Sequence, residues 1–246
     1  MTYCVAIKLD AGLVLMSDTR TNAGVDNISR FRKMYTWEIP GQRAIATMSS
    51  GNLSITQGVI NRLSAAIKRA EAGEEIETIL NAPTMFRIAQ IVGETMVAMQ
   101  ERHRSTLIEQ GAGADALILV AGQLSTGDHR AFMVYSAGNF IEATEDTPFL
   151  QIGEHKYGKP ILDRVITPQT PVNVALQALF LSMDSTIRSN LSVGMPCDLA
   201  VIPTGACRFS TLRRINPEDE DWQALSNTWA DAIRGAFEKL PEVRLE

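Results

Sequence analysis

Apolar residues alternate with polar or small residues at the start of the chain and recur at helical spacing in several later segments. A period of two is typical of strands, whereas apolar residues three to four positions apart are typical of helices. The alternating and short apolar runs predict strands over 2–9, 12–17, 33–39, 43–49, 115–122, 131–136, 139–143, 198–203 and 206–213. The helical spacing predicts helices over about 52–72, 83–107, 155–165, 171–188 and 218–240.

The order of these elements predicts a layered α+β fold. Two blocks of hairpins alternate with two pairs of helices, so we expect two antiparallel sheets packed on each other with helices outside, a four-layer α-β-β-α sandwich. No linker rich in Pro, Gly or Ser interrupts the chain, which favours one domain over 1–246. The helix stripes are expected to be core. In the last helix the stripe comprises Trp222, Leu225, Trp229, Ile233 and Phe237.

Composition excludes several classes of protein. The net charge is −5 and no basic patch is visible, so nucleic acid is not an expected partner. No apolar run approaches the roughly 20 residues of a membrane span, and no signal peptide is visible. Three cysteines without motif spacing indicate reduced thiols and a cytoplasmic location. The histidines show no metal-ligand spacing, and we expect neither a metal nor an organic cofactor.

The start of the chain carries the candidate chemistry. Thr2 follows Met1 directly and opens the first predicted strand, and a turn at Asp10-Ala11-Gly12 returns the chain toward that start. No segment other than Met1 is expected to precede Thr2. If Met1 is removed, Thr2 supplies both a hydroxyl nucleophile and a free amine to activate it. Such an amine has a pKa of roughly 8, so it is partly unprotonated near neutral pH.

Two further residues fit this chemistry. Lys33 opens the third predicted strand, where its ammonium would lower the pKa of a nearby amine. Asp18 ends the second strand, beside the start of the first, and its carboxylate would hold the lysine. Alone, an aspartate at a strand end is normally a turn residue and a lysine at a sheet edge is normally solvated. It is the order of Thr2, Asp18 and Lys33 along a strand-turn-strand unit that favours a catalytic group.

This order resembles that of the N-terminal-nucleophile hydrolases, and within them the proteasome β-type subunits. Thr2, the segment Asp18-Thr-Arg20-Thr-Asn-Ala-Gly24 and Lys33 match the motif of that family. The resemblance implies that Thr2, Asp18 and Lys33 are catalytic and that Arg20 is supporting. It also implies that a backbone N–H in the turn before the first long helix, near Met48 or Ser49, stabilises the oxyanion.

Later segments depart from the family pattern. The family's Arg-Asp-x-x-Ser-Gly stretch corresponds to Arg188-Ser-Asn-Leu-Ser-Val-Gly194, in which Ser192 matches the serine and Ser189 stands in place of the aspartate. We expect both serines to support the site. The family's Gly-Ser-Gly turn corresponds best to Gly153-Glu154-His155, which lacks the serine. These departures indicate slow or specialised activity, or proton handling by different partners such as Glu154 or His155.

Within the family, the chain is most similar to the bacterial Anbu group of ancestral β subunits, since it ends in a long charged helix. The resemblance implies a homo-oligomer, open helical or ring-like, and a peptide substrate. No docking motif for an ATPase unfoldase is readable.

The sequence therefore predicts a threonine peptidase that is active after removal of Met1. Two alternatives stay open: an amidohydrolase of the same kind acting on small acyl amides, and a catalytically silent assembly subunit.

Overall fold

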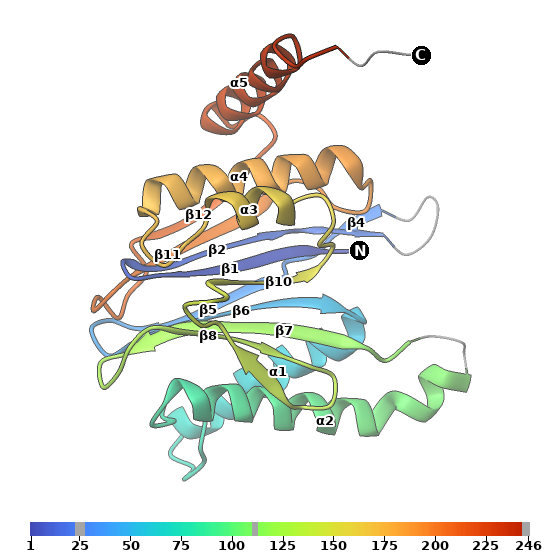
Figure 1. Cartoon of the computed structure of the whole chain (residues 1–246). Helices are drawn as coiled ribbons and strands as arrows, with labels where there is room; N and C mark the ends of the chain where they lie inside the picture. The colour runs from blue at the N-terminus through green and yellow to red at the C-terminus, as the bar shows by residue number, and fades with distance from the viewer. Residues whose placement is uncertain (23–27, 110–112, 243–246) are drawn as a thin grey trace.

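Two five-stranded antiparallel sheets form the centre of the molecule (Figure 1). The computed structural model describes residues 1–22, 28–109 and 113–242. The first sheet has the order β10-β1-β2-β11-β12, with β10 (Phe149–Gly153), β1 (Tyr3–Leu9), β2 (Gly12–Asp18), β11 (Cys197–Pro203) and β12 (Thr211–Ile215). The second has the order β5-β6-β7-β8-β9, with β5 (Met34–Ile39), β6 (Arg43–Gly51), β7 (Ala116–Leu124), β8 (Arg130–Val134) and β9 (Phe140–Glu142).

Helices flank the two sheets. They are α1 (Leu53–Glu71), α2 (Met85–Glu109), α3 (Lys159–Val165), α4 (Val172–Ser189) and α5 (Glu220–Phe237). Figure 1 shows α3 and α4 beside the first sheet and α1 and α2 beside the second. A separate two-stranded ribbon, β3 (Arg20–Asn22) with β4 (Ile28–Arg30), adds a third antiparallel sheet to the two that were predicted. The predicted α+β class and the antiparallel pairing are confirmed.

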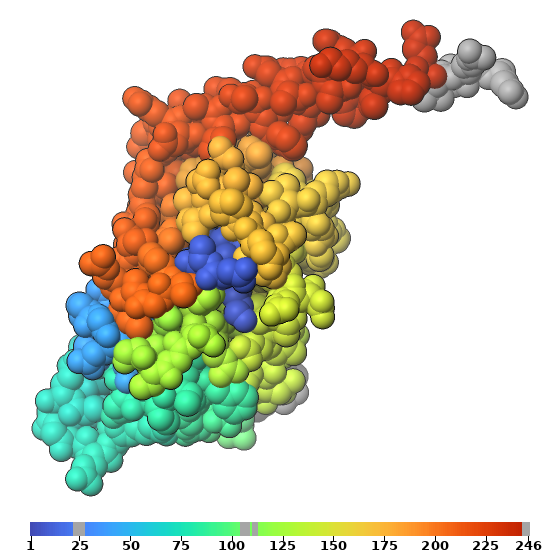
Figure 2. Space-filling model, turned by 60° about the vertical axis from the view of Figure 1, so that its left-hand side comes forward, coloured from blue at the N-terminus to red at the C-terminus, as the bar shows by residue number. Residues whose placement is uncertain are grey.

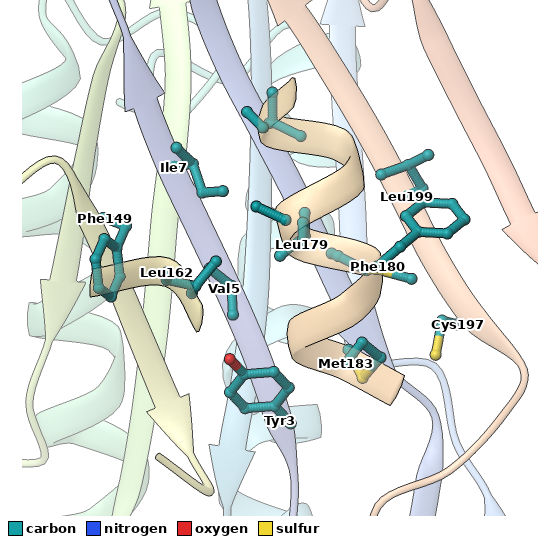
Figure 3. Packing of buried hydrophobic residues seen from close by; sticks show 14 of the residues in the cluster. Tyr3, Val5, Ile7, Phe149, Leu162, Leu179, Phe180, Met183, Cys197 and Leu199 are labelled. Carbon is teal, nitrogen blue, oxygen red and sulfur yellow. The ribbon is translucent and has the colours of Figure 1, made fainter. Parts of the chain in front are cut away.

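Strand alternation explains why β1 is buried on both faces. Its odd-numbered residues, including Val5 and Ile7, pack against α3 and α4, as Figure 3 shows for Leu162 and Leu179. Its even-numbered residues face the other sheet, in a cluster that contains Cys4, Ala6, Ala44, Ala46, Met48 and Leu119. Successive side chains of a strand point to opposite faces, so a strand between two layers is apolar on both faces. Lys8, near the end of β1, is the charged residue of the strand and is only partly buried.

Besides β3 and β4, sequence reasoning missed strand β10, and it misplaced the ends of other strands. Strand β10 pairs with β1 from Tyr3↔Gly153 to Ile7↔Phe149, a contact between distant segments that local pattern cannot reveal. Helix α3 begins at Lys159 rather than 155, because the Glu154 side chain accepts hydrogen bonds from the N–H groups of the next two residues and holds them in a turn. Strand β12 begins at Thr211 rather than 206. Ala23 and Gly24 of the predicted motif lie outside the described residues.

The apolar stripe of α5 is core at one end only, which corrects the expectation that it is core throughout. Trp222 is 8% exposed and packs on Phe180 of α4, with ring centroids 5.5 Å apart. Ile233 and Phe237 are 39% and 69% exposed. Figures 1 and 2 show the reason: α5 lies beyond α4, and its far end projects from the body. The periodicity of a helix fixes its apolar face but not how much of that face meets a partner.

Candidate active site

Thr2 lies at the start of β1, beside the turn that follows β10. It is 6% exposed, and its carbonyl oxygen accepts a hydrogen bond of 2.6 Å from the Glu154 N–H. Gly153 has φ +86°, and a Cβ on this residue would overlap the Thr2 carbonyl. A glycine is therefore required both by the backbone conformation and by the close approach to Thr2. The register of β10 against β1 thus fixes the position of the candidate nucleophile.

Asp18 lies at the end of β2, where the β1–β2 register places it next to Tyr3. Its carboxylate is fully buried and accepts four hydrogen bonds, two on each oxygen. Oδ1 accepts from Lys33 Nζ at 2.7 Å and from Tyr3 N–H at 3.0 Å, and Oδ2 accepts from the N–H groups of Arg20 at 3.1 Å and Gly194 at 3.2 Å. Burial raises the pKa of the Asp18 carboxyl, while Lys33 and these N–H donors oppose that shift.

Lys33 is 4% exposed and is surrounded by oxygen atoms. Besides Asp18, its Nζ donates to the Arg20 carbonyl at 2.6 Å and lies 3.5 Å from the Met1 carbonyl oxygen. The carbon of that carbonyl is bonded to the Thr2 nitrogen. The ammonium is therefore placed at the one peptide bond whose cleavage would free the Thr2 amine. The pKa of the Met1 amine is lowered, by burial first and by the Lys33 charge second, with Asp18 opposing.

Arg20 connects this group to the loop after α4. Its Nη1 donates to the Leu191 carbonyl at 2.9 Å, and its guanidinium packs over Gly194, where a Cβ would overlap it. Gly194 lies in the same loop, and its N–H donates to the Asp18 carboxylate. Arg20 therefore supports the carboxylate through its own backbone N–H and through the loop that it holds.

The two predicted serines are placed differently. Ser192 is half-buried, and its backbone N–H donates to Asn190 Oδ1 at 3.0 Å. Ser189 is exposed at the end of α4, so the structure does not bring its side chain into the buried group. The residue after it, Asn190, is 9% exposed and directs Nδ2 toward Met1 Sδ, 3.8 Å away.

Sequence reasoning missed Asn190 and named Glu154 only as an alternative partner. Asn190 Nδ2 donates to Glu154 Oε2 at 2.7 Å, and Glu154 Oε1 accepts from two backbone N–H groups. Burial raises the pKa of the Glu154 carboxyl, but these donors outweigh burial and leave it below its usual value. Glu154 was detectable in the sequence because it stands where the family has the serine of its Gly-Ser-Gly turn. No local signal marks Asn190, because it reaches the site only through the fold. His155 is exposed.

The two predicted oxyanion donors, Met48 and Ser49, lie within strand β6. The Ser49 N–H donates to the Lys33 carbonyl at 3.1 Å, so it is committed to the contact between β5 and β6. Met48 is 1% exposed and lies between paired strands, opposite Met34 of β5 and Leu119 of β7. The Ser49 N–H is therefore not free, and Met48 lies inside the paired part of β6, which continues to Gly51.

The other candidates for chemistry in the described part of the chain are buried thiols and the side chains that ligate metals. Burial raises the pKa values of the Cys4 and Cys197 thiols, so both stay un-ionised and are poor nucleophiles. Within residues 1–22, 28–109 and 113–242, no His, Cys, Asp or Glu side chains gather into a group of three or more that would hold a metal ion. None of the helices in these ranges combines the length and hydropathy needed to cross a bilayer.

Comparison with known proteins agrees with this geometry. No protein-family model and no curated protein matches the chain. Among solved structures it is similar to Anbu (ancestral beta-subunit) from Yersinia bercovieri, with 39% identity, 99% of each chain covered and a TM-score of 0.91.

Two further Anbu structures are similar over nearly the whole chain. Anbu from Hyphomicrobium sp. strain MC1 is 43% identical, with 99% of this chain and 100% of that chain covered and a TM-score of 0.89. The helical assembly of the Anbu complex from Pseudomonas aeruginosa is 40% identical, with 98% of each chain covered and a TM-score of 0.91. At this identity over its full length, the chain belongs to the Anbu family of ancestral β subunits.

Proposed function

We propose that this chain is a threonine-nucleophile peptidase of the proteasome β kind that becomes active when Met1 is removed. The observation that carries the proposal is the buried Lys33 ammonium, held by Asp18 and aimed at the bond between Met1 and Thr2. Burying a charged pair is unfavourable unless its hydrogen bonds are satisfied. A buried pair placed at the chain terminus therefore favours a catalytic role over a purely structural one.

The mechanism uses Thr2 for two tasks. The Thr2 Oγ attacks the substrate carbonyl carbon while the Thr2 amine takes the hydroxyl proton. The tetrahedral intermediate collapses, the protonated amine gives its proton to the leaving nitrogen, and an ester to Thr2 remains. Water, deprotonated by the same amine, hydrolyses this ester. Lys33 keeps the pKa of the amine low by electrostatic repulsion, and Asp18 fixes the lysine in place.

For the oxyanion we propose the end of β6 rather than Met48 or Ser49. Alternate N–H groups of a strand point to the same side, and the Ser49 N–H points toward Lys33. Gly51 lies two residues after Ser49, so its N–H points to the same side of β6. At Gly51, however, β6 extends past the start of β5, and Gly51 has φ +101°. One such donor contributes roughly 3 kcal/mol to transition-state stabilisation.

Removal of Met1 is part of the proposal. With Met1 present, the Thr2 nitrogen is an amide and has no basic lone pair to accept the hydroxyl proton. Met1 is 63% exposed, which leaves it accessible to an aminopeptidase, and Thr2 is a small residue of the kind that such enzymes accept after methionine. Self-assembly into a helical or ring-like homo-oligomer, a cytoplasmic location and the four-layer order of sheets and helices complete the proposal. The Pseudomonas aeruginosa relative is itself described as a helical assembly.

The test is covalent labelling of Thr2. Intact mass first shows whether Met1 is absent from the purified full-length protein. A peptide epoxyketone, which reacts with both a hydroxyl and a free amine, is then added to the wild type, Thr2→Ala and Lys33→Ala. We expect one adduct on Thr2 in the wild type, none in Thr2→Ala, and strongly slowed labelling in Lys33→Ala.

Other outcomes favour the alternatives. An adduct with small acyl lactones but not with peptide probes would favour hydrolysis of small acyl amides. The low exposure of Thr2 is also consistent with a small substrate. Retained methionine, or no adduct on processed protein, would favour the catalytically silent assembly subunit.

A further inference from the structure

We propose that Asn190 is a specificity-determining residue that selects substrates whose acyl-side residue carries a neutral hydrogen-bond acceptor, such as the side-chain amide of glutamine. The inference rests on the proposed function, because it concerns the substrate of the same site. It is carried by the contact between Asn190 Nδ2 and the Met1 side chain.

The Asn190 amide is held at both ends, so its orientation is defined. Its Oδ1 accepts from the Ser192 N–H at 3.0 Å, and its Nδ2 donates to Glu154 Oε2 at 2.7 Å. The reverse assignment of the amide would place a donor against an N–H and an acceptor against a carboxylate. Glu154 is in turn 5% exposed and fixed by the N–H groups of His155 and Lys156.

This arrangement leaves the second N–H of Asn190 for whatever lies beside Thr2. In the present structure that atom is Met1 Sδ, 3.8 Å away. A thioether sulfur is a weak acceptor, and Asn190 is 9% exposed, so its N–H has little access to water instead. A buried donor with so weak a partner favours a stronger acceptor at the same position.

Met1 marks where an acyl residue would lie. It is acylated onto the Thr2 nitrogen, and the nitrogen and Oγ of one threonine are close enough for an acyl group to pass between them through a five-membered ring. The acyl residue of a covalent intermediate on Oγ therefore occupies similar space. Met Sδ is the third side-chain atom from Cα, where glutamine has its amide carbon, so the glutamine Oε1 extends to the Asn190 N–H.

The charges nearby favour a neutral acceptor over a carboxylate. The Glu154 carboxylate lies directly behind Asn190, and its pKa is held below the usual value. A second carboxylate on the acyl residue would face this charge at short range. The Lys33 ammonium lies on the other side, at the Met1 carbonyl, and is already paired with Asp18.

The experiment compares three matched peptide epoxyketones that differ only in the acyl-side residue: glutamine, norleucine and glutamate. Second-order labelling rates of Thr2 are measured by intact mass on Met1-free, full-length protein. We expect the wild type to prefer glutamine over norleucine by about three- to tenfold, the value of one neutral hydrogen bond, and to react more slowly with glutamate. Asn190→Ala should abolish the preference, whereas Asn61→Ala, exposed on α1, should keep it.

Each result has one meaning. Equal wild-type rates for glutamine and norleucine would overturn the role of Asn190, and this holds even if Asn190→Ala fails to fold. A preference that persists in a folded Asn190→Ala protein would do the same. If no probe labels Thr2 in the wild type, both the proposed function and the proposed role of Asn190 fail. If the probes label Thr2 at equal rates, only the role of Asn190 fails.

Discussion

Lys33 Nζ and Asp18 Oδ1 lie 2.7 Å apart, and the two side chains are only 4% and 0% exposed. The pair joins the end of β2 to the residue before β5, so it connects the first sheet to the second at the position of Thr2. The further polar contacts of the two side chains are with backbone groups at the chain start, at Arg20 directly after β2, and in the loop after α4. The position of the ammonium therefore depends on three segments that are distant in sequence.

Removing one partner should destabilise the protein strongly. Lys33→Met leaves the Asp18 carboxylate buried without its counter-ion, for which we expect a loss of about 3–5 kcal/mol in the free energy of unfolding. Asp18→Asn combined with Lys33→Met should recover part of that loss, because neither charge then remains. Urea denaturation of the three proteins measures this. A double variant that is no more stable than Lys33→Met would contradict this expectation.

Gly153→Ala should displace Thr2. The substitution places a methyl group against the Thr2 carbonyl and an alanine at φ +86°. Gly41→Ala is the matched control, since Gly41 has φ +73° and open space around it. We expect the control to lose only the roughly 1–2 kcal/mol of a left-handed alanine, and Gly153→Ala to lose more and to abolish Thr2 labelling. Equal loss in both variants would mean that the turn does not position Thr2.

The labelling rate should depend on pH through the terminal amine. Burial and Lys33 lower the pKa of the Met1 amine, and the amine of processed Thr2 would be subject to the same two causes. The amine acts as a base only when unprotonated, so the rate should fall as the pH drops through its pKa. The midpoint should lie below about 8, the ordinary α-amine value.

Lys33→Met gives the direction of the electrostatic effect. Loss of the positive charge removes the repulsion that favours the neutral amine, so the midpoint should move to higher pH while the rate declines. The measurement is the epoxyketone labelling rate over pH 5–10. A midpoint that stays in place or moves lower would rule out electrostatic tuning by Lys33.

Arg20→Ala should loosen the loop after α4 without unfolding the protein. The guanidinium of Arg20 holds Leu191 and packs over Gly194, whose N–H donates to Asp18. We expect faster hydrogen exchange at the Gly194 amide and a labelling rate reduced several-fold. Arg30→Ala, an exposed position on β4, serves as the control. Unchanged exchange at Gly194 would show that Arg20 does not support the loop.

The two ends of α5 should differ in their contribution to stability. Trp222→Ala removes a buried side chain that packs on Phe180, and comparable losses cost about 3–5 kcal/mol. Phe237 is 69% exposed, so Phe237→Ala should change the subunit's stability by no more than about 0.5 kcal/mol. Thermal and urea unfolding at dilute subunit concentration measures both. A large effect of Phe237→Ala there would contradict the position of α5.

The sequence by itself determined the kinds of element and the candidate chemistry. Alternation is a local property, so the strands around Thr2 and Asp18 were predictable, and so was the strand that begins next to Lys33, β5. The α+β class followed from the order of the elements. The residue order of the N-terminal segment indicated the proteasome β-type family, and the long charged C-terminal helix indicated the Anbu group, which the comparisons confirm.

Only the tertiary structure decided what meets at Thr2. The pairing of β10 with β1 brings Glu154 to Thr2, and the end of α4 brings Asn190 to Met1. The contact between β6 and the start of β5 pairs the Ser49 N–H with the Lys33 carbonyl. These contacts join residues far apart in the chain, and no periodicity encodes them. The same holds for α5, whose apolar stripe is visible in the sequence although its burial depends on where the helix leaves α4. Hydrogen-bond partners and burial are properties of packed surfaces, so they are defined only when the layers come together.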